Sequence, residues 1–242
     1  MMDDREAIFA RISRRSYRPD PLDAATDAKI CDLVAAADRD GGLFLAYVKD
    51  RPDLFGGIRK TYGLLSGVRN FIVLAGAESD PDAAEKCGYF GERVVLELTK
   101  LGLGTCWVGG SFDRGRVGEL LAPGRTLFGV ITLGKVDAAF SPRERLVRFS
   151  THLRASGEGR FHRTDGTEPD WFFEAVARLA LAPSAVNRRP VFLNVEHGVV
   201  RAVLRIRDAF TPIDLGIAKF HVATAFPDGV WEWGDGGRFL NP

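Results

Sequence analysis

The chain has 242 residues, of which 45% are hydrophobic and 27% are charged, and its 33 basic and 32 acidic side chains leave a formal net charge of +1. This composition is typical of a globular protein and excludes a disordered one, while the balanced charge gives no general attraction to nucleic acid or to an anionic membrane. The charged start, Met1 to Glu6, and the lack of an apolar run of roughly 18 residues predict neither a secretory signal nor a membrane span, so we expect a cytoplasmic protein.

Helices and strands alternate along the first half of the sequence. Apolar residues at helical spacing predict one helix from Thr26 to Gly41-Gly42 and another from Asp82 to Gly102. Asp113 is expected to cap a further short helix. Short apolar runs bounded by turn residues predict strands between these helices. The strands are expected at residues 43–48, 71–75, 105–108 and 126–133.

The second half repeats this order after a polar segment. Residues 138–166 are rich in Arg, Ser, Gly and Glu without apolar periodicity, and we interpret them as a linker. Thr167 and Asp170 predict a capping box for a helix whose apolar stripe ends at Leu179. Beta-branched runs around a Gly-containing turn then predict a hairpin. The hairpin is expected at residues 191–206, followed by a helix at 212–225 and a strand at 230–233.

The two halves can also be matched residue by residue. Residues 91–108 slide onto 216–233 without a gap, so that Gly91 meets Gly216 at an offset of 125 (216 − 91). Two helix, strand, helix, strand units in one chain favour a duplicated half, that is, a fused pseudo-dimer. Chance matching of small residues is the alternative explanation.

Arginines and a hydroxyl group gather near the start of the chain. Arg11, Arg14, Arg15 and Arg18 lie close to Ser16. The C-terminal end of a solvated helix would favour cations in this way. A bound phosphate explains the cluster better, because guanidinium groups and a hydroxyl make charge-assisted hydrogen bonds to it. The segment is therefore a candidate phosphate site.

Two further segments have the composition of ligand contacts. Residues 182–190 read Ala-Pro-Ser-Ala-Val-Asn-Arg-Arg-Pro, and their two prolines hold donors and acceptors at fixed positions, although a plain helix-to-strand turn is the alternative. Residues 102–112 read Gly-Leu-Gly-Thr-Cys-Trp-Val-Gly-Gly-Ser-Phe, and their glycines allow a flat ligand to approach the backbone. Their spacing is not that of a dinucleotide-binding loop.

The remaining reactive side chains predict no other site. The three cysteines are widely spaced and contain no Cys-x-x-Cys pair, so neither a disulfide framework nor a zinc site is indicated. None of the four histidines is spaced with other ligands as in a metal site. These histidines are His152, His162, His197 and His221. We expect no metal and no catalytic side chain.

The segments 14–18 and 182–190, together with residues 91–110, resemble the nitroreductase family of FMN-dependent NAD(P)H oxidoreductases. The resemblance covers nearly the whole chain and is closest to a fused subgroup with two half-domains. It implies an α+β, nitroreductase-like α/β/α layered fold, in which residues 1–137 and 167–242 form the halves around the 138–166 linker. It also implies a monomer that acts as its own pseudo-dimer.

The resemblance implies roles for particular residues. The phosphate and ribityl chain would be held by Arg14, Arg15 and Ser16, with Arg18 near the N1/O2 edge of the flavin. The ring or ribityl chain would be contacted from the other half by Pro183, Ser184, Ala185, Asn187 and Arg189. Gly109 and Gly110 would pass beside the flavin, and Arg143 would close on the phosphate. Because neither half carries both patterns, we expect one FMN per chain.

The implied activity is hydride transfer from NAD(P)H to bound FMN, followed by reduction of a nitroaromatic, quinone-like or other small organic acceptor in the same pocket, with ping-pong kinetics. In such chemistry the protein supplies binding, orientation and electrostatics rather than a nucleophile. One alternative is a flavin-binding carrier or sensor without turnover. Another is an interaction protein that keeps the fold and binds no flavin.

Overall fold

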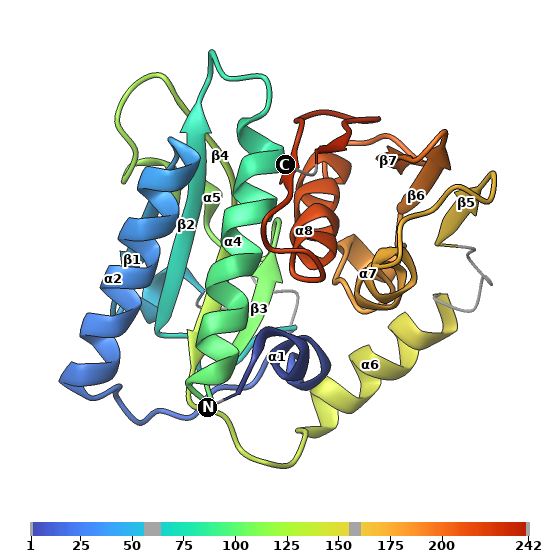
Figure 1. Cartoon of the computed structure of the whole chain (residues 1–242). Helices are drawn as coiled ribbons and strands as arrows, with labels where there is room; N and C mark the ends of the chain where they lie inside the picture. The colour runs from blue at the N-terminus through green and yellow to red at the C-terminus, as the bar shows by residue number, and fades with distance from the viewer. Residues whose placement is uncertain (1, 56–63, 155–160, 241–242) are drawn as a thin grey trace.

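The computed structural model describes residues 2–55, 64–154 and 161–240, which form a four-stranded, a three-stranded and a two-stranded β-sheet together with helices (Figure 1). Blue to green segments form the left side of Figure 1, and orange to red segments form the right side. No helix in these described ranges is long and apolar enough to cross a membrane. The α+β class expected from the sequence is confirmed.

The first sheet belongs to the first half of the chain. Its four antiparallel strands are β1 (Phe44–Val48), β2 (Asn70–Ala77), β4 (Arg125–Gly134) and β3 (Gly104–Val108), in that spatial order. Successive side chains of a strand point to opposite faces. In β2, Ile72 and Leu74 therefore pack against α2 (Ala24–Gly41) and α4 (Ala83–Lys100). The opposite face is covered by η1 (Pro52–Leu54), α5 (Arg114–Gly118) and Tyr17.

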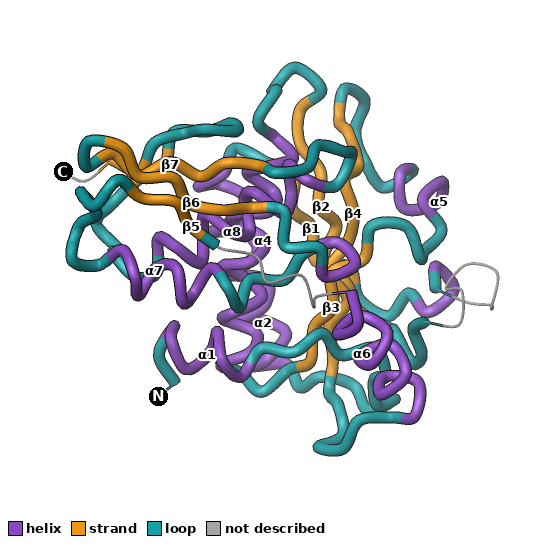
Figure 2. Tube along the Cα trace, turned by 90° about the vertical axis from the view of Figure 1, so that its right-hand side faces the viewer, coloured by secondary structure: helices purple, strands orange, loops and turns teal. Residues whose placement is uncertain are grey.

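The second half repeats this arrangement on a smaller scale. The hairpin of β6 (Val191–Glu196) and β7 (Val199–Leu204) confirms the expected one, and β5 (His162–Thr164) pairs with β6 in parallel (Figure 2). A separate pair, β8 (Val230–Trp231) and β9 (Phe239–Leu240), meets β7 through the bridge Arg201–Arg238. The order β6-β7-β9-β8 thus matches β1-β2-β4-β3. Helices α7 (Phe172–Leu179) and α8 (Thr211–Ala223) pack on this sheet.

Helices α4 and α8 pack against each other with their backbones in close contact. A Cβ atom on Gly88 would lie 2.1 Å from the Ile213 carbonyl oxygen, and one on Gly216 would lie 1.8 Å from the Glu85 carbonyl oxygen. The two contacts are equivalent if the halves are matched at an offset of 128. This offset pairs Gly88 with Gly216 (216 − 88) and Glu85 with Ile213 (213 − 85). The helices also begin 128 residues apart (211 − 83). The offset of 125 derived from the sequence is therefore wrong by three residues in this helix pair.

The segment that we interpreted as a linker contains regular structure. It includes β5 and also α6 (Pro142–Arg154). Ser141 Oγ accepts from the Glu144 backbone N–H at 3.2 Å, and Glu144 Oε2 accepts from the Ser141 N–H at 2.9 Å. These two bonds form a capping box with proline at the first helical position, which stabilises a helix start even where the following residues are polar.

Two helix starts also differ from expectation. The N-cap of α2 is Asp23, whose side chain accepts from the Thr26 backbone N–H. Helix α7 begins at Phe172 with no side-chain cap, and Thr167 instead accepts from the Gly198 N–H at 2.7 Å. Thr167 therefore fixes the β6–β7 turn rather than the helix. The described residues also include the short helices α1 (Asp4–Ala10) and η2 (Ala185–Asn187).

Candidate functional site

A cavity of about 720 Å³ lies where the two halves meet. Its volume falls within the range of small-molecule sites. From the first half it is lined by Ser13, Arg15, Cys106, Trp107, Gly109, Gly110 and Phe128, among others. From the second half it is lined by Pro183, Ser184, Ala185, Arg188, Phe210 and Asp214, among others. The cavity thus joins residues from all three segments that the sequence singled out.

The arginine segment is fixed along the edge of the first sheet. The backbone N–H of Arg14 donates to the Thr105 carbonyl of β3 at 2.8 Å, and Ser66 N–H donates to the Arg15 carbonyl at 2.9 Å. The buried Tyr17 hydroxyl lies 2.7 Å from Thr132 Oγ1 of β4 and donates to the Arg14 carbonyl at 2.8 Å. Alternate side chains of this extended segment face opposite sides. Ser13 and Arg15 therefore face the cavity, whereas Arg14 and Ser16 do not line it.

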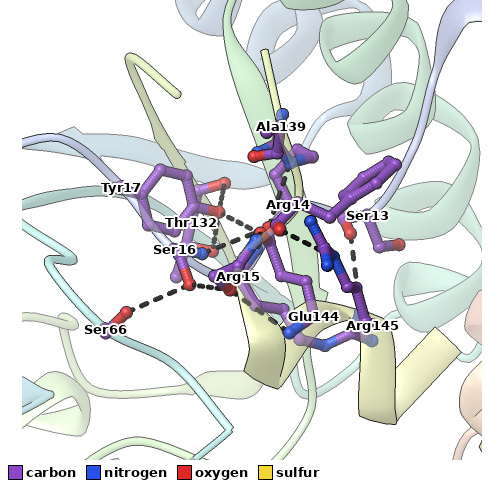
Figure 3. Close-up of polar contacts among 12 residues, drawn as sticks. Ser13, Arg14, Arg15, Ser16, Tyr17, Ser66, Thr132, Ala139, Glu144 and Arg145 are labelled. Atoms are coloured by element: carbon purple, nitrogen blue, oxygen red, sulfur yellow. Dashed lines mark hydrogen bonds and ion pairs between the residues drawn. The ribbon is translucent and has the colours of Figure 1, made fainter. Parts of the chain in front are cut away.

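Arg14 and Ser16 contact the start of α6 instead (Figure 3). Glu144 Oε1 accepts from Arg14 Nε at 3.0 Å, from the Arg15 backbone N–H at 2.8 Å and from the Ser16 backbone N–H at 3.3 Å. The Ser16 and Ser141 hydroxyl oxygens are 2.8 Å apart. Three donors that would suit a phosphate oxygen thus bind a carboxylate of the same chain.

The surroundings of the Glu144 carboxylate stabilise its charged form. Its side chain is 1% exposed. Burial alone would raise its pKa, but the Arg14 guanidinium and the backbone N–H groups stabilise the charged form and bring the pKa down to about 2. Glu144 is therefore ionised at neutral pH and neutralises Arg14. Arg15 remains as a cation on the cavity wall, with a hydrogen bond from Nη1 to the Ser13 carbonyl at 3.5 Å.

The loop between α7 and β6 has an unusual backbone. Val186, Asn187 and Arg189 have φ angles of 47°, 58° and 50°, a region that is costly for a β-branched residue such as valine. Bonds from both ends hold this conformation. The Arg189 N–H donates to Ser184 Oγ at 2.8 Å, and the Ala185 N–H donates to Asp214 Oδ1 of α8 at 2.9 Å. Strained backbone of this kind concentrates at functional sites.

Gly109 and Gly110, which we call the glycine wall of the cavity, directly follow the end of β3. Trp107 Nε1 donates to Glu92 Oε2 of α4 at 2.8 Å, and the other oxygen of this carboxylate lies 3.0 Å from His221 Nε2 of α8. Both His221 and Glu92 are fully buried. This network fixes Trp107 beside Gly109 and Gly110 and ties the wall to both central helices.

Several expected ligand residues lie outside the cavity lining. Arg18 is half-exposed and pairs with Asp20 at 2.8 Å. Arg189 lies over the Phe161 ring at 5.7 Å. Arg143 donates from Nη1 to the carbonyl of Leu65, a lining residue, at 3.3 Å. Asn187 lies in the loop without lining the cavity.

Sequence reasoning missed three residues at or beside the cavity. Glu144 belongs to a Ser-x-x-Glu capping box that a search for helix starts in the polar segment would have found. Arg188 lies inside the loop that we had singled out, yet nothing in the sequence separates it from Arg189. Asp214 had no local signal, because its importance arises from burial against the loop. Within the described ranges, no group of three or more His, Cys, Asp or Glu side chains could hold a metal ion.

Comparisons with known proteins show the family and the fold of this chain. A family model described as "Putative TM nitroreductase" matches residues 4–226. A crystal structure from Thermotoga maritima, described as a "putative nitroreductase", has 22% identity and a TM-score of 0.63, and the match covers 100% of this chain and 95% of that one. It shares the fold of this chain.

Other solved structures match a little over half of this chain. A nitroreductase with bound FMN from Bacteroides fragilis has 18% identity and a TM-score of 0.47, covering 58% of this chain and 92% of its own. An FMN-dependent nitroreductase from Clostridium difficile has 18% identity and a TM-score of 0.46, covering 55% and 87%. No curated protein matches the sequence. Because the family model extends over most of the chain, the protein belongs to the nitroreductase family.

Proposed function

We propose that the protein is an FMN-dependent oxidoreductase that takes hydride from NAD(P)H and reduces a small organic acceptor, such as a nitroaromatic compound or a quinone. The observation that carries the proposal is that Arg15 and Ser184 line one cavity although 169 positions separate them in the sequence (184 − 15). Tertiary packing thus brings a basic segment of the first half to the strained loop of the second half.

The cavity suits a flavin mononucleotide. Arg15 offers a cation for the phosphate, and Trp107, Phe128 and Phe210 offer apolar surface for the ring. A Cβ atom on Gly110 would meet nothing within 4 Å, so no packing contact explains this glycine. Its lack of a side chain leaves room for a planar group beside the backbone.

Within this site we assign the phosphate to Arg15 and Arg143 rather than to Arg14 and Ser16. Removing one partner from a buried ion pair such as Arg14–Glu144 costs about 3–5 kcal/mol. The phosphate therefore gains more at Arg15, which needs no such displacement.

Bound FMN would accept hydride from NAD(P)H and pass the electrons to a second acceptor in the same pocket, which gives ping-pong kinetics. The protein binds and orients the reactants. Pro183, Ser184 and Ala185 form one wall, and Gly109 and Gly110 form another. Because the two halves contribute different walls, we propose that residues 1–137 and 167–242 act as a pseudo-dimer within one chain and bind one FMN.

The phosphate assignment is tested by comparing FMN with riboflavin, which lacks the phosphate. Arg15→Gln should weaken FMN binding about 10- to 100-fold, the equivalent of the charge-assisted bonds lost, and leave riboflavin binding unchanged. The matched control is the double variant Arg14→Gln/Glu144→Gln, which removes both charges of the internal pair. It should keep the wild-type ratio of FMN to riboflavin affinity. If the double variant behaves like Arg15→Gln, the phosphate lies at Arg14.

The flavin carrier without turnover is the second candidate, because the half-enclosed cavity has to admit a nicotinamide as well as the flavin. Anaerobic addition of NADH or NADPH to the yellow FMN-loaded protein separates the two functions. An oxidoreductase is bleached rapidly by one of the two nucleotides. Persistent yellow colour with both would favour the carrier.

A further inference from the structure

One buried carboxylate connects the three segments of the chain that carry the cavity walls. Glu92 lies on α4, is fully buried and is not itself a lining residue of the cavity. Its Oε2 accepts from Trp107 Nε1 at 2.8 Å. Its Oε1 lies 3.0 Å from His221 Nε2 and 3.6 Å from Arg11 Nε. We call these four residues the Glu92 network.

Each partner of Glu92 is close in the sequence to residues that line the cavity. Trp107 ends in the glycine wall, Arg11 begins the arginine segment, and His221 lies on α8 of the second half. A single buried group therefore fixes these three segments relative to one another. The lining residues concerned are Gly109 and Gly110 after Trp107, Ser13 and Arg15 after Arg11, and Ile213 and Ile217 before His221.

The Trp107 side chain is held from two sides without help from a ligand. Its indole N–H, which can only donate, points to Glu92. Its ring rests directly on α4, because a Cβ atom on Gly91 would lie 2.6 Å from Trp107 Cη2. His221 is held in turn, with Nδ1 lying 3.0 Å from the Arg178 carbonyl oxygen. The end of β3, where the glycine wall begins, is therefore preformed.

We propose that Glu92 is a positioning residue for flavin binding, which acts through Trp107 on the glycine wall. The inference rests on the proposed function, in which this wall lies beside the planar ring. Binding to a preformed wall loses less conformational entropy than binding to one that must first be ordered. Flavin affinity should thus depend on Glu92 although Glu92 does not line the cavity. The dependence should concern the ring and not the phosphate.

Titration of the apoprotein with FMN and with riboflavin, followed by flavin fluorescence, tests this role. The variant is Glu92→Leu and the matched control is Glu85→Leu. Glu85 lies seven residues earlier on α4 (92 − 85), is also buried and pairs with Lys219 across the same helix contact, but away from the cavity lining. Both variants lose a buried carboxylate, so both should unfold at lower urea concentrations than wild type.

The two variants should differ in flavin binding. Glu92→Leu should weaken FMN and riboflavin by the same factor, about 10-fold or more, while Glu85→Leu changes neither. Wild-type affinity of Glu92→Leu for both flavins would overturn the positioning role, and so would an equal loss in Glu85→Leu. Weakening of FMN alone would place the effect at the phosphate and overturn the assignment to Trp107. Failure of wild-type protein to bind FMN would overturn the proposed function as well.

Two further variants test whether Glu92 acts through Trp107. In Glu92→Gln the amide oxygen still accepts from the indole and the amide N–H donates to His221 Nε2, so flavin affinity should stay close to that of wild type. Trp107→Phe removes the indole donor, and on this background Glu92→Leu should have little further effect. A loss in Glu92→Gln as large as in Glu92→Leu, or additive losses in the double variant, would overturn the mechanism.

A shorter side chain keeps the test available if Glu92→Leu does not fold. Glu92→Asp retains the charge but withdraws the carboxylate by one methylene group, and Glu85→Asp is its control. Glu92→Asp should weaken both flavins by one common factor, and Glu85→Asp should weaken neither. Unchanged flavin affinity in Glu92→Asp would contradict the positioning role.

Discussion

The two halves of the molecule share one order of elements but differ in what they contribute. The first sheet has long strands, with 8 residues in β2 and 10 in β4, whereas β8 and β9 have two residues each. The first half brings Arg15 and the glycine wall to the cavity, and the second half brings the strained loop with Arg188 and Asp214. The two halves therefore contribute different residues to one cavity.

The contact between the halves contains buried charged groups as well as the close glycine contacts of α4 and α8. Lys219 is fully buried on α8, and its Nζ donates to Glu85 Oε1 of α4 at 2.5 Å and to the Glu232 and Gly234 carbonyls at 2.8 and 2.9 Å. Burial lowers the pKa of Lys219 and raises that of Glu85, and each partner opposes the shift of the other. Each charge therefore depends on the other half.

The largest expected effect comes from breaking this pair. Lys219→Met leaves the Glu85 carboxylate buried without its cation and should lower the free energy of unfolding by about 3–5 kcal/mol. The control is Lys49→Met, which removes an exposed pair with Asp27 on the first half and should cost less than about 1 kcal/mol. Urea unfolding measures both. Equal losses would mean that the interface does not depend on the buried charges.

The second-largest expected loss of stability comes from Glu144, which lies in the segment that joins the halves. Glu144→Gln keeps the size of the side chain but removes its charge, and should cost about 2–3 kcal/mol at pH 7. The wild-type pKa of about 2 is depressed below the ordinary value of 4.5. The stabilisation is therefore complete above pH 4.5 and is lost as the pH falls toward 2.

Urea unfolding of wild type and Glu144→Gln at pH 7, 4 and 3 measures this effect. The difference in unfolding free energy between them should shrink as the pH falls. A difference that stays constant down to pH 3 would show that the charge of Glu144 does not anchor the arginine segment.

A smaller effect is expected at the helix contact. Gly216→Ala would place a methyl group against the Glu85 carbonyl and force α4 and α8 apart, at a cost of about 1–3 kcal/mol. Gly118→Ala on α5 is the control, because a Cβ there meets nothing within 4 Å. The higher helix propensity of alanine should make that variant more stable by up to about 1 kcal/mol. Thermal unfolding compares the two, and a neutral Gly216→Ala would contradict the close helix contact.

The sequence predicted what depends on local pattern. The apolar periodicity of α4 and the β6–β7 hairpin with its Gly198 turn were expected close to their observed bounds, because burial follows a repeat that can be read along the chain. The α6 helix was missed because its residues are mostly polar, and only the Ser141 and Glu144 cap indicates it. The offset of 125 between the halves was wrong for α4 and α8 because several small residues offer similar matches in the sequence, and only packing selects Gly88 with Gly216.

The candidate site was predicted as a set of segments rather than as individual contacts. The prolines at 183 and 190 and the arginine cluster lie in segments that contribute residues to the cavity lining. The sequence could not indicate that Arg14 pairs with Glu144, 130 positions away (144 − 14). Nor could it indicate that Arg15, rather than Arg14, lines the cavity. Nor could it indicate that Asp214 is buried against Ala185. All three depend on long-range packing.

Isothermal titration of the apoprotein with FMN tests most directly whether the two halves build one flavin site. We expect one FMN per chain, with binding that Arg15→Gln weakens. Two FMN molecules per chain, or no binding at all, would contradict the account.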